Sequence, residues 1–306
     1  MTLQKRSYTA GHFELAIDGH PSTAYLKSID GGHPRGTPVS EPFGSDLHQA
    51  KHISVVEVEP LTFEFGMSGA DDVLKVIQAS WRKQYARMSG QVTHANFDLQ
   101  ATLEHEFYDA LICETTFPSL DGSSKDAAYL KVKVQPESAV IRTPSGNNTI
   151  GSNFSPKQKL WVPSGFRFNL EGLDSMKYTN KIESFTIKQG VKRHMTGDER
   201  FGECTPTKIE FPNISGTISM EFAGPLMKWA AQYLTTGQRD TATQRSGSIE
   251  FLSPDRAETI FTVNLFEVGV VYAAPVSSGA ESIKRVKFEL YVGRMDIDGK
   301  GMLAMS

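Results

Sequence analysis

One pattern, repeated at an offset of 153, constrains this sequence more than any other feature. Residues 13–19 read FELAIDG and residues 166–172 read FRFNLEG. In both segments large apolar residues alternate with other types, which is the period of a half-buried strand. Each segment then ends on an acid followed by Gly, which is chemistry typical of a tight turn. The recurrence indicates that one structural unit is present twice.

Four more segment pairs recur in the same order at similar offsets. They are 71–81 with 224–234, 89–92 with 246–249, 107–112 with 265–270, and 130–134 with 286–290. Small loop insertions explain why the offset drifts only slightly. We interpret the chain as a tandem duplication of a unit of about 140 residues.

Each unit contains one segment with helical periodicity. The first helix is predicted over 71–81, and its apolar stripe is Val73, Leu74, Ile77, Trp81 and Tyr85. Ser68, Asp71 and Asp72 suit its start, and Gly90 suits its end. In the copy, Pro225 lies in the first turn and Gly237 follows the end. The apolar stripe of the copy is Leu226, Trp229, Tyr233 and Leu234.

The other periodic segments predict strands rather than helices. They lie near 91–99, 101–116 and 128–135, and in the copy near 248–252, 258–273 and 283–293. Two polar, Gly-containing segments, 30–50 and 188–207, are predicted to be long loops with a shared role in stacking or in reaching a neighbour. A mobile surface loop is the alternative.

The fold class follows from this arrangement. Strands do not alternate with helices, so a doubly wound sheet is not expected. We predict a mainly β (α+β) chain of two tandem antiparallel β-sandwich or barrel domains, each with one packed α-helix. The predicted boundaries are 1–137 for the first domain, 138–159 for a linker and 160–306 for the second domain. Val140 and Ile141 are expected to pair at a strand edge within this linker.

Composition excludes several other classes of protein. The formal net charge is −3, so no overall basic footprint for nucleic acid exists. There is no run of 18 apolar residues, and MTLQKRSYTAGHF lacks the apolar core of a secretory signal. Cys113 and Cys204 are the only cysteines, which predicts neither a disulfide framework nor zinc and favours folding in a reducing cytoplasm. Residues 1–150 carry −5 and residues 151–306 carry +2, which either attracts subunits or has no role.

The order of the segments resembles the tail-tube proteins of contractile phages and related injection systems, with the type VI secretion tube as a more distant relative. The matching segments are FELAIDG, LKSIDGG, VLKVIQASW, EHEFYDALI and YLKVKV. The resemblance covers most of residues 8–136 and, more loosely, residues 160–295. Typical tube subunits carry one such domain, whereas this chain carries two.

The resemblance implies a structural role, with six domains in a ring and rings stacked into a hollow tube. Two domains per chain then predict a trimer with pseudo-sixfold symmetry, and a ring of six chains is the alternative. The implied partners are sheath and baseplate proteins, with DNA or effector cargo passing through the channel without specific binding. The implied location is a virion tail or phage-derived particle assembled in the host cytoplasm, with no membrane. Glu57, Glu59 and Glu64 are candidate acidic residues of the channel.

Two further readings of the function are kept open. A duplicated chain also suits a tube initiator or an adapter ring at the baseplate or neck. GMSGA at 66–70 resembles a degenerate nucleophile elbow, so a serine hydrolase would use Ser68 with His94 or His105. The copy has no Ser there, and a capping role for Ser68 is the simpler interpretation.

Metal or cofactor binding is not predicted. His48 and His52, four positions apart, and the EHE of 104–106 are expected to be outward polar residues, because a strand directs His105 away from its two neighbours. Lys75 and Lys228 match across the copies and suit solvated helix faces or a salt bridge within a ring.

Overall fold

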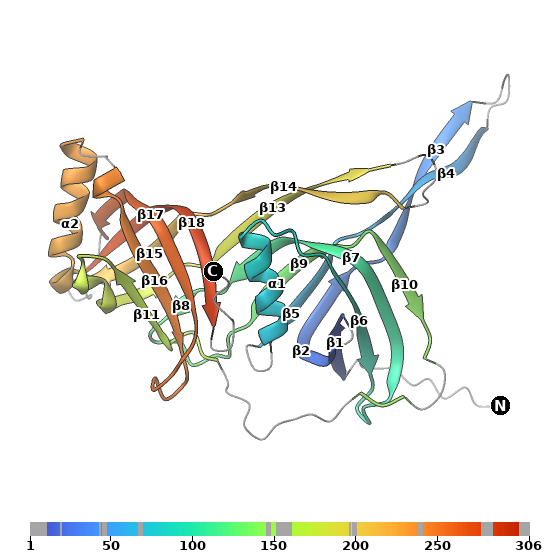
Figure 1. Cartoon of the computed structure of the whole chain (residues 1–306), viewed down its shortest axis with the longest axis horizontal. Helices are drawn as coiled ribbons and strands as arrows, with labels where there is room; N and C mark the ends of the chain where they lie inside the picture. The colour runs from blue at the N-terminus through green and yellow to red at the C-terminus, as the bar shows by residue number, and fades with distance from the viewer. Residues whose placement is uncertain are drawn as a thin grey trace.

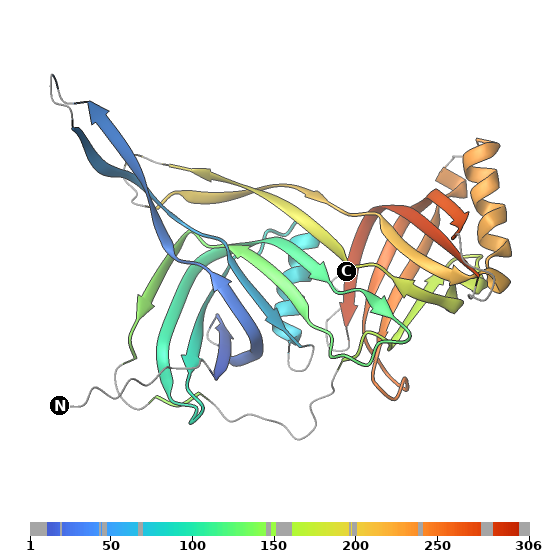
Figure 2. The same cartoon turned by 180° about the vertical axis from the view of Figure 1, so that it is seen from behind.

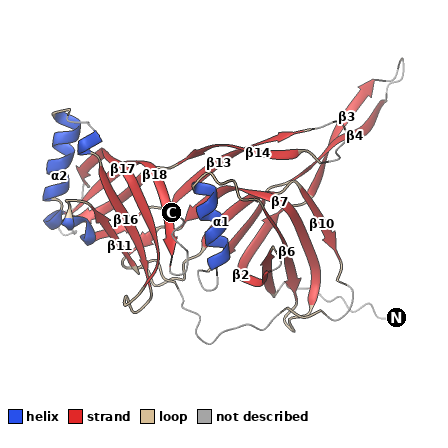
Figure 3. Cartoon of the chain, in the orientation of Figure 1, coloured by secondary structure: helices blue, strands red, loops and turns tan. Residues whose placement is uncertain are grey.

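The computed structural model describes residues 11–18, 20–42, 44, 48–66, 70–144, 148–150, 161–195, 197, 201–237, 241–276 and 284–299. The elements of the first half are β1 (His12–Ile17), β2 (His20–Gly31), β3 (Pro34–Pro42), β4 (Gln49–Val58), β5 (Leu61–Phe65), α1 (Asp71–Trp81), β6 (Met88–Ala95), β7 (Ala101–Phe117), β8 (Leu120–Asp121), β9 (Leu130–Gln135) and β10 (Ser138–Arg142). Strands predominate, and Figure 3 shows only a few helical segments beside them. Neither α-helix in the described part is long and apolar enough to cross a membrane.

The second half repeats this order of elements. They are β11 (Phe166–Leu170), η1 (Asp174–Tyr178), β12 (Thr179–Ile182), β13 (Phe185–His194), β14 (Glu203–Glu210), β15 (Ile214–Ser219), η2 (Met220–Phe222), α2 (Gly224–Ala230), η3 (Ala231–Thr235), η4 (Thr241–Thr243), β16 (Arg245–Leu252), β17 (Thr259–Pro275) and β18 (Arg285–Gly299). Figure 1 shows two strand-rich units side by side, each with one main helix. The predicted fold class, mainly β with antiparallel sheets and packed helices, is confirmed.

The two units share one strand order, but only the first closes into a ring. In the first unit the order runs β7–β6–β1–β2–β5–β9, and β9 pairs with β7 again. In the second unit the equivalent order is β17–β16–β11 on one side and β17–β18–β15–β12 on the other. Among the described strands β11 and β12 do not pair, so this sheet is a half-barrel. The segment that forms the start of β2 in the first unit is the 3-10 helix η1 in the second.

The strand registers reproduce the sequence offsets. Phe13 pairs with His94, and Phe166 pairs with Phe251, which correspond to offsets of 153 and 157. Ile112 pairs with Val134, and Val270 pairs with Leu290, which correspond to offsets of 158 and 156. A register shift directly follows Ile112 in β7, and another directly follows Val270 in β17. A repeated register cannot slip by one position without reversing every side chain, so the agreement supports the duplication.

Backbone irregularities also recur at equivalent positions. Asp109 in β7 has φ 50° and Glu267 in β17 has φ 57°, and the two positions are related by the same offset of 158. Residues other than Gly rarely adopt this conformation. Its presence at the same point of both long strands indicates that the twist of the sheet demands it there.

The helix predictions are confirmed in position but not at every boundary. The first helix spans Asp71–Trp81 as predicted, and Val73, Leu74 and Ile77 are buried. Tyr85 was wrongly placed in its stripe, because the chain leaves the helix after Trp81 and Lys83 adopts a φ of 60°. Gly90 does not end the helix either, since it lies within β6. Ser68 lies outside the described residues.

The second helix follows its predicted pattern except at Leu234, which was wrongly placed in the buried stripe. Pro225 lies in its first turn, and Gly237 has φ 71° beyond its end. Leu226, Trp229 and Tyr233 are buried, whereas Leu234 is exposed. The last turn, η3, is a π-helix.

The two predicted long loops are instead β-hairpins, so those predictions were wrong. Residues 34–58 form the hairpin β3–β4, and residues 185–210 form the hairpin β13–β14. We call them the first arm and the second arm. Arg35 pairs with Glu57 in the first arm and Lys188 with Glu210 in the second, a uniform offset of 153. Gly and Pro content suggested loops, but paired strands can hold these residues where ladder bonds are interrupted, as at the register shift beside Pro38.

The predicted linker also contains a strand. Val140 and Ile141 belong to β10, which pairs with β7 as expected. Together β9 and β10 correspond to the single long strand β18, because Ser138 pairs with Tyr108 as Arg294 pairs with Phe266.

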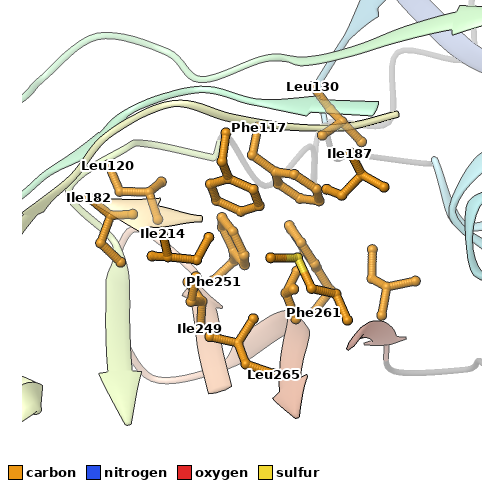
Figure 4. Close-up of a cluster of buried hydrophobic side chains, with 14 of the residues drawn as sticks. Phe117, Leu120, Leu130, Ile182, Ile187, Ile214, Ile249, Phe251, Phe261 and Leu265 are labelled. Carbon is orange, nitrogen blue, oxygen red and sulfur yellow. The ribbon is translucent and has the colours of Figure 1, made fainter. Parts of the chain in front are cut away.

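Aromatic side chains fill the region where the two units meet (Figure 4). Phe117 from β7 stacks on Phe185 from β13, with ring centroids 4.8 Å apart. It also lies 5.6 Å from Phe251 and 6.2 Å from Phe261, both of the second unit. Because Phe117 is fully buried, the two units share one continuous apolar core.

Candidate assembly surface

The second arm lies along the first unit and extends its sheet. β13 pairs with the end of β7 from Phe185↔Phe117 to Lys188↔Glu114. Figure 1 shows this arm, drawn in yellow, passing over the first unit. A strand from one unit therefore covers a sheet edge of the other, which is how exposed edges are satisfied.

Polar contacts hold the outer part of the second arm, near the last pairs of β13 and β14. Arg193 donates to the backbone oxygen of Pro136 at 2.9 Å, and Arg87 donates to that of Cys204 at 2.7 Å. Glu137 accepts from the backbone N–H of Cys204 at 2.8 Å and pairs with Arg87. These charge-assisted bonds fix where the arm crosses the corner between β9 and β10.

Helix α1 forms the second part of the contact between the units. Gln78 donates to the backbone oxygen of Ile297 at 2.6 Å. Arg82 binds Asp296 through two nitrogens, the shortest distance being 2.7 Å. The hydrogen bond to Asp296 raises the pKa of Arg82. We call the two contacts, β13 on β7 and α1 on β18, the internal joint.

The first arm has no unit of its own chain beneath its outer part. It leaves the first unit on the side away from the second unit (Figures 1 and 2). Ile53, near its outer part, is 64% exposed. A pocket of about 340 Å³ lies between the base of the first arm and the outer part of the second arm, and its lining includes Arg35, Glu57, Gln135 and Arg193. The residues that line this pocket do not form a recognisable catalytic arrangement.

The histidines considered for catalysis lie in the first unit's barrel. His105 was predicted to face outward, which is wrong, because it is 1% exposed. Its Nε2 lies 2.9 Å from the backbone oxygen of Gly32, and its ring stacks on His33 at 5.2 Å. Burial lowers the pKa of both His94 and His105. Since Ser68 lies outside the described residues, these contacts give no catalytic arrangement with it.

The other predicted polar residues are dispersed. Glu106 pairs with Arg142 at 3.3 Å, and His52 lies 3.9 Å from Glu41 in the first arm. Among the described residues no group of three or more His, Cys, Asp or Glu side chains is placed to hold a metal.

Two of the candidate channel acids and the first of the two matched lysines make local contacts. Glu59 pairs with Arg35 at 3.3 Å, Glu64 lies 3.7 Å from Lys27, and Glu57 is exposed in β4. Lys75 pairs with Asp72 within α1 at 3.0 Å.

The surface that matters was missed from the sequence because it consists of strand edges and apolar side chains. Val140, Ile141, Leu234, Val271 and Tyr272 are all substantially exposed. Their periodicity alone matched buried positions. Only comparison of equivalent positions between the two units identifies them.

Comparison with known proteins gives structural similarity only. No protein-family model and no curated protein matches the chain. Among solved structures, a component of the sheath–tube complex of the extracellular contractile injection system PVC matches at 13% identity and TM-score 0.40, covering 46% of this chain and 95% of the other. A component of the tube-terminating cap of the anti-feeding prophage matches at 12% identity and TM-score 0.36, covering 47% and 100%. Hcp1 from Flavobacterium johnsoniae matches at 13% identity and TM-score 0.27, covering 44% and 95%.

Proposed function

We propose that this protein is a structural subunit that builds rings of a tail tube or of a related part of a contractile injection particle. The observation that carries the proposal is the internal joint. Two units of equivalent strand order and register bind each other through different surfaces, β7 and α1 on one and β13 and β18 on the other. A heterologous joint of this kind can repeat from unit to unit, and it forms a ring when its rotation closes, which we propose here.

We propose that three chains form one ring of six units. Each chain supplies two equivalent units, so a six-unit ring needs three chains. Six is the number that the resemblance to tail-tube proteins implies. The alternative of six chains per ring would place only one kind of unit at the channel.

A second role, an initiator or adapter ring, is favoured by one difference between the units. The first unit is a closed barrel, whereas the second is open between β11 and β12. A ring of three chains would therefore present a threefold pattern within a pseudo-sixfold frame. Such a ring suits the place where threefold and sixfold parts of a particle meet.

In this proposal the protein acts by assembly rather than by catalysis. Its neighbours would be sheath and baseplate proteins, and DNA or effector cargo would pass through the channel without specific binding. The setting would be a virion tail or a phage-derived particle. The serine-hydrolase alternative requires Ser68. It predicts hydrolytic activity in the wild type that Ser68→Ala abolishes, whereas our proposal predicts no activity and unchanged assembly.

Native mass spectrometry of isolated rings tests the stoichiometry. We expect a mass of three chains. A mass of six chains per ring, with class averages showing one unit type around the channel, would contradict the three-chain proposal. If the protein stays monomeric at every concentration and no rings are recovered, ring formation itself is contradicted.

A further inference from the structure

We propose that one end of this chain binds the opposite end of a second copy of the chain. This contact between chains repeats the internal joint. The α2–β17 end of one chain would receive the β3–β10 end of the next. This inference rests on the proposed ring function and names the surface that would carry it. Figure 1 shows α2 at one end of the molecule and β10 with the first arm at the other.

The repeat offsets translate each part of the internal joint. Gln78 and Arg82 of α1 correspond to Ala231 and Thr235, at offset 153. The offset of 156 maps Asp296 and Ile297 of β18 back to Val140 and Ile141 of β10. These offsets are the ones that the strand registers reproduce. The free ends therefore carry the equivalent of each half of the helix–strand contact.

The strand contact translates in the same way. Glu114–Phe117 of β7 corresponds to Tyr272–Pro275 of β17. Phe185–Lys188 of β13 corresponds to residues 32–35, where β3 begins. The arms align without any gap, because Arg35↔Glu57 and Lys188↔Glu210 are equivalent pairs. The start of the first arm is thus the counterpart of the strand that covers β7.

Side chains at the free ends are more exposed than their equivalents in the internal joint, as expected if the free ends lack a partner. Trp81 is 4% exposed, and its equivalent Leu234 is 39% exposed. Ile297 is fully buried, and its equivalent Ile141 is 40% exposed. Residues covered within the chain at the internal joint are therefore uncovered at both free ends. Clustered exposed apolar side chains of this kind mark a contact surface.

One edge of β17 is also uncovered among the described strands. The end of β7 pairs with both β9 and β13. The equivalent segment Tyr272–Pro275 pairs with β18, and no described strand covers its other edge. Val271 and Tyr272 are exposed beside this edge. An open edge with apolar side chains is a template for an added strand, which a second copy supplies in the first arm.

The directions of the arms agree with a head-to-tail repeat. Both arms leave their own units toward the same side of the molecule (Figures 1 and 2). The second arm reaches the first unit of its own chain. The first arm points away from the chain, toward where the second unit of a neighbouring copy would lie.

The chemistry of the two joints differs most at the ion pair. Within the chain, Arg82 binds Asp296 at 2.7 Å. At the free ends the equivalents are Thr235 and Val140, so the contact between chains would be apolar there. This difference permits a test in which the ion pair of the internal joint is transplanted.

The test uses the full chain with Val140→Asp, Thr235→Arg, and both together. Val140→Asp alone would place an unpaired carboxylate in the contact and raise the concentration needed for half-assembly by roughly a hundredfold. Thr235→Arg alone would weaken assembly, and the double variant would restore it toward wild type. Sedimentation velocity and native mass spectrometry measure the assembly. Thermal unfolding of each unassembled variant shows that its fold is intact, as expected for exposed positions.

Phe97→Asp is the matched control, because Phe97 is exposed and has no counterpart in the internal joint. It should leave ring formation unchanged. If wild type assembles and Val140→Asp does not weaken assembly, or Thr235→Arg does not rescue it, the proposed surface is wrong while the ring function stands. If wild type never assembles, the ring function itself is wrong.

Discussion

At the scale of single residues, the first unit holds a buried histidine, His105, at a position where the second unit has an apolar residue. His105 lies between strands of the barrel beside His33 and close to His94. At the offset of 158, the equivalent of His105 is Val263, which is fully buried. An apolar residue at the equivalent position shows that the site is part of a core, not a surface. Burial lowers the pKa of His105 more than the hydrogen bond to Gly32 raises it.

This lowered pKa predicts an acid-sensitive first unit. The unfolded chain binds a proton at His105 below about pH 6.5, whereas the folded chain resists it. The free energy of unfolding should therefore fall as the pH drops below about 6.5. His105→Gln should reduce this slope, as measured by urea unfolding between about pH 7 and pH 5. The exposed His52→Gln is the control. If His105→Gln left the pH dependence of the free energy of unfolding unchanged, His105 would not be its source. Part of the wild-type dependence is expected to remain in this variant because His94 is still present.

At the scale of elements, the two arms have equivalent hairpins but different surroundings. The second arm is held by Phe185, Arg193 and the backbone of Cys204. The outer part of the first arm lies away from the body of its chain (Figure 2). The stability of the single chain should therefore depend on one arm and its assembly on the other.

Shortening each arm separates these roles. Thr37 pairs directly with Val55, so Asn-Gly in place of residues 38–54 closes the first arm with a two-residue turn. We expect the melting temperature of the single chain to stay within a few degrees and ring assembly to be lost. Asn-Gly in place of residues 192–205 should instead lower the melting temperature, because it removes Arg193 and Cys204. A first-arm variant that still forms rings would show that the outer part of this arm acts only outside the ring.

At the scale of the whole molecule, the units are equivalent in register but not identical. One barrel closes and the other stays open, because β2 and η1 take different conformations over equivalent residues. The sheet of the first unit also receives both strands of the second arm. Symmetry between the units is therefore approximate.

The approximate symmetry predicts the appearance of isolated rings. Class averages calculated without imposed symmetry should show threefold rather than sixfold rotational symmetry, since alternating units around the ring differ. Electron microscopy of rings measures this directly. True sixfold averages with identical densities would contradict a ring of three two-unit chains.

The sequence by itself determined the duplication, the fold class and the position of the first helix. These features depend on alternation, helical spacing and recurring offsets, which are local properties of the chain. It misplaced Tyr85 and Gly90, because the end of a helix depends on where the following strand must pair. It described residues 30–50 and 188–207, most of both arms, as loops, since Gly and Pro were weighed without knowledge of their strand partners.

Only the tertiary structure decided which equivalent residues are covered. FELAIDG and FRFNLEG begin equivalent strands in the same register, yet β1 pairs with β2 whereas β11 has no such partner among the described strands. Ile141 and Ile297 are the same residue type at equivalent positions, one exposed and one buried. That difference arises because a neighbouring unit lies on one of them and not on the other. No local pattern encodes it, since burial at a joint depends on contacts between residues far apart in the chain.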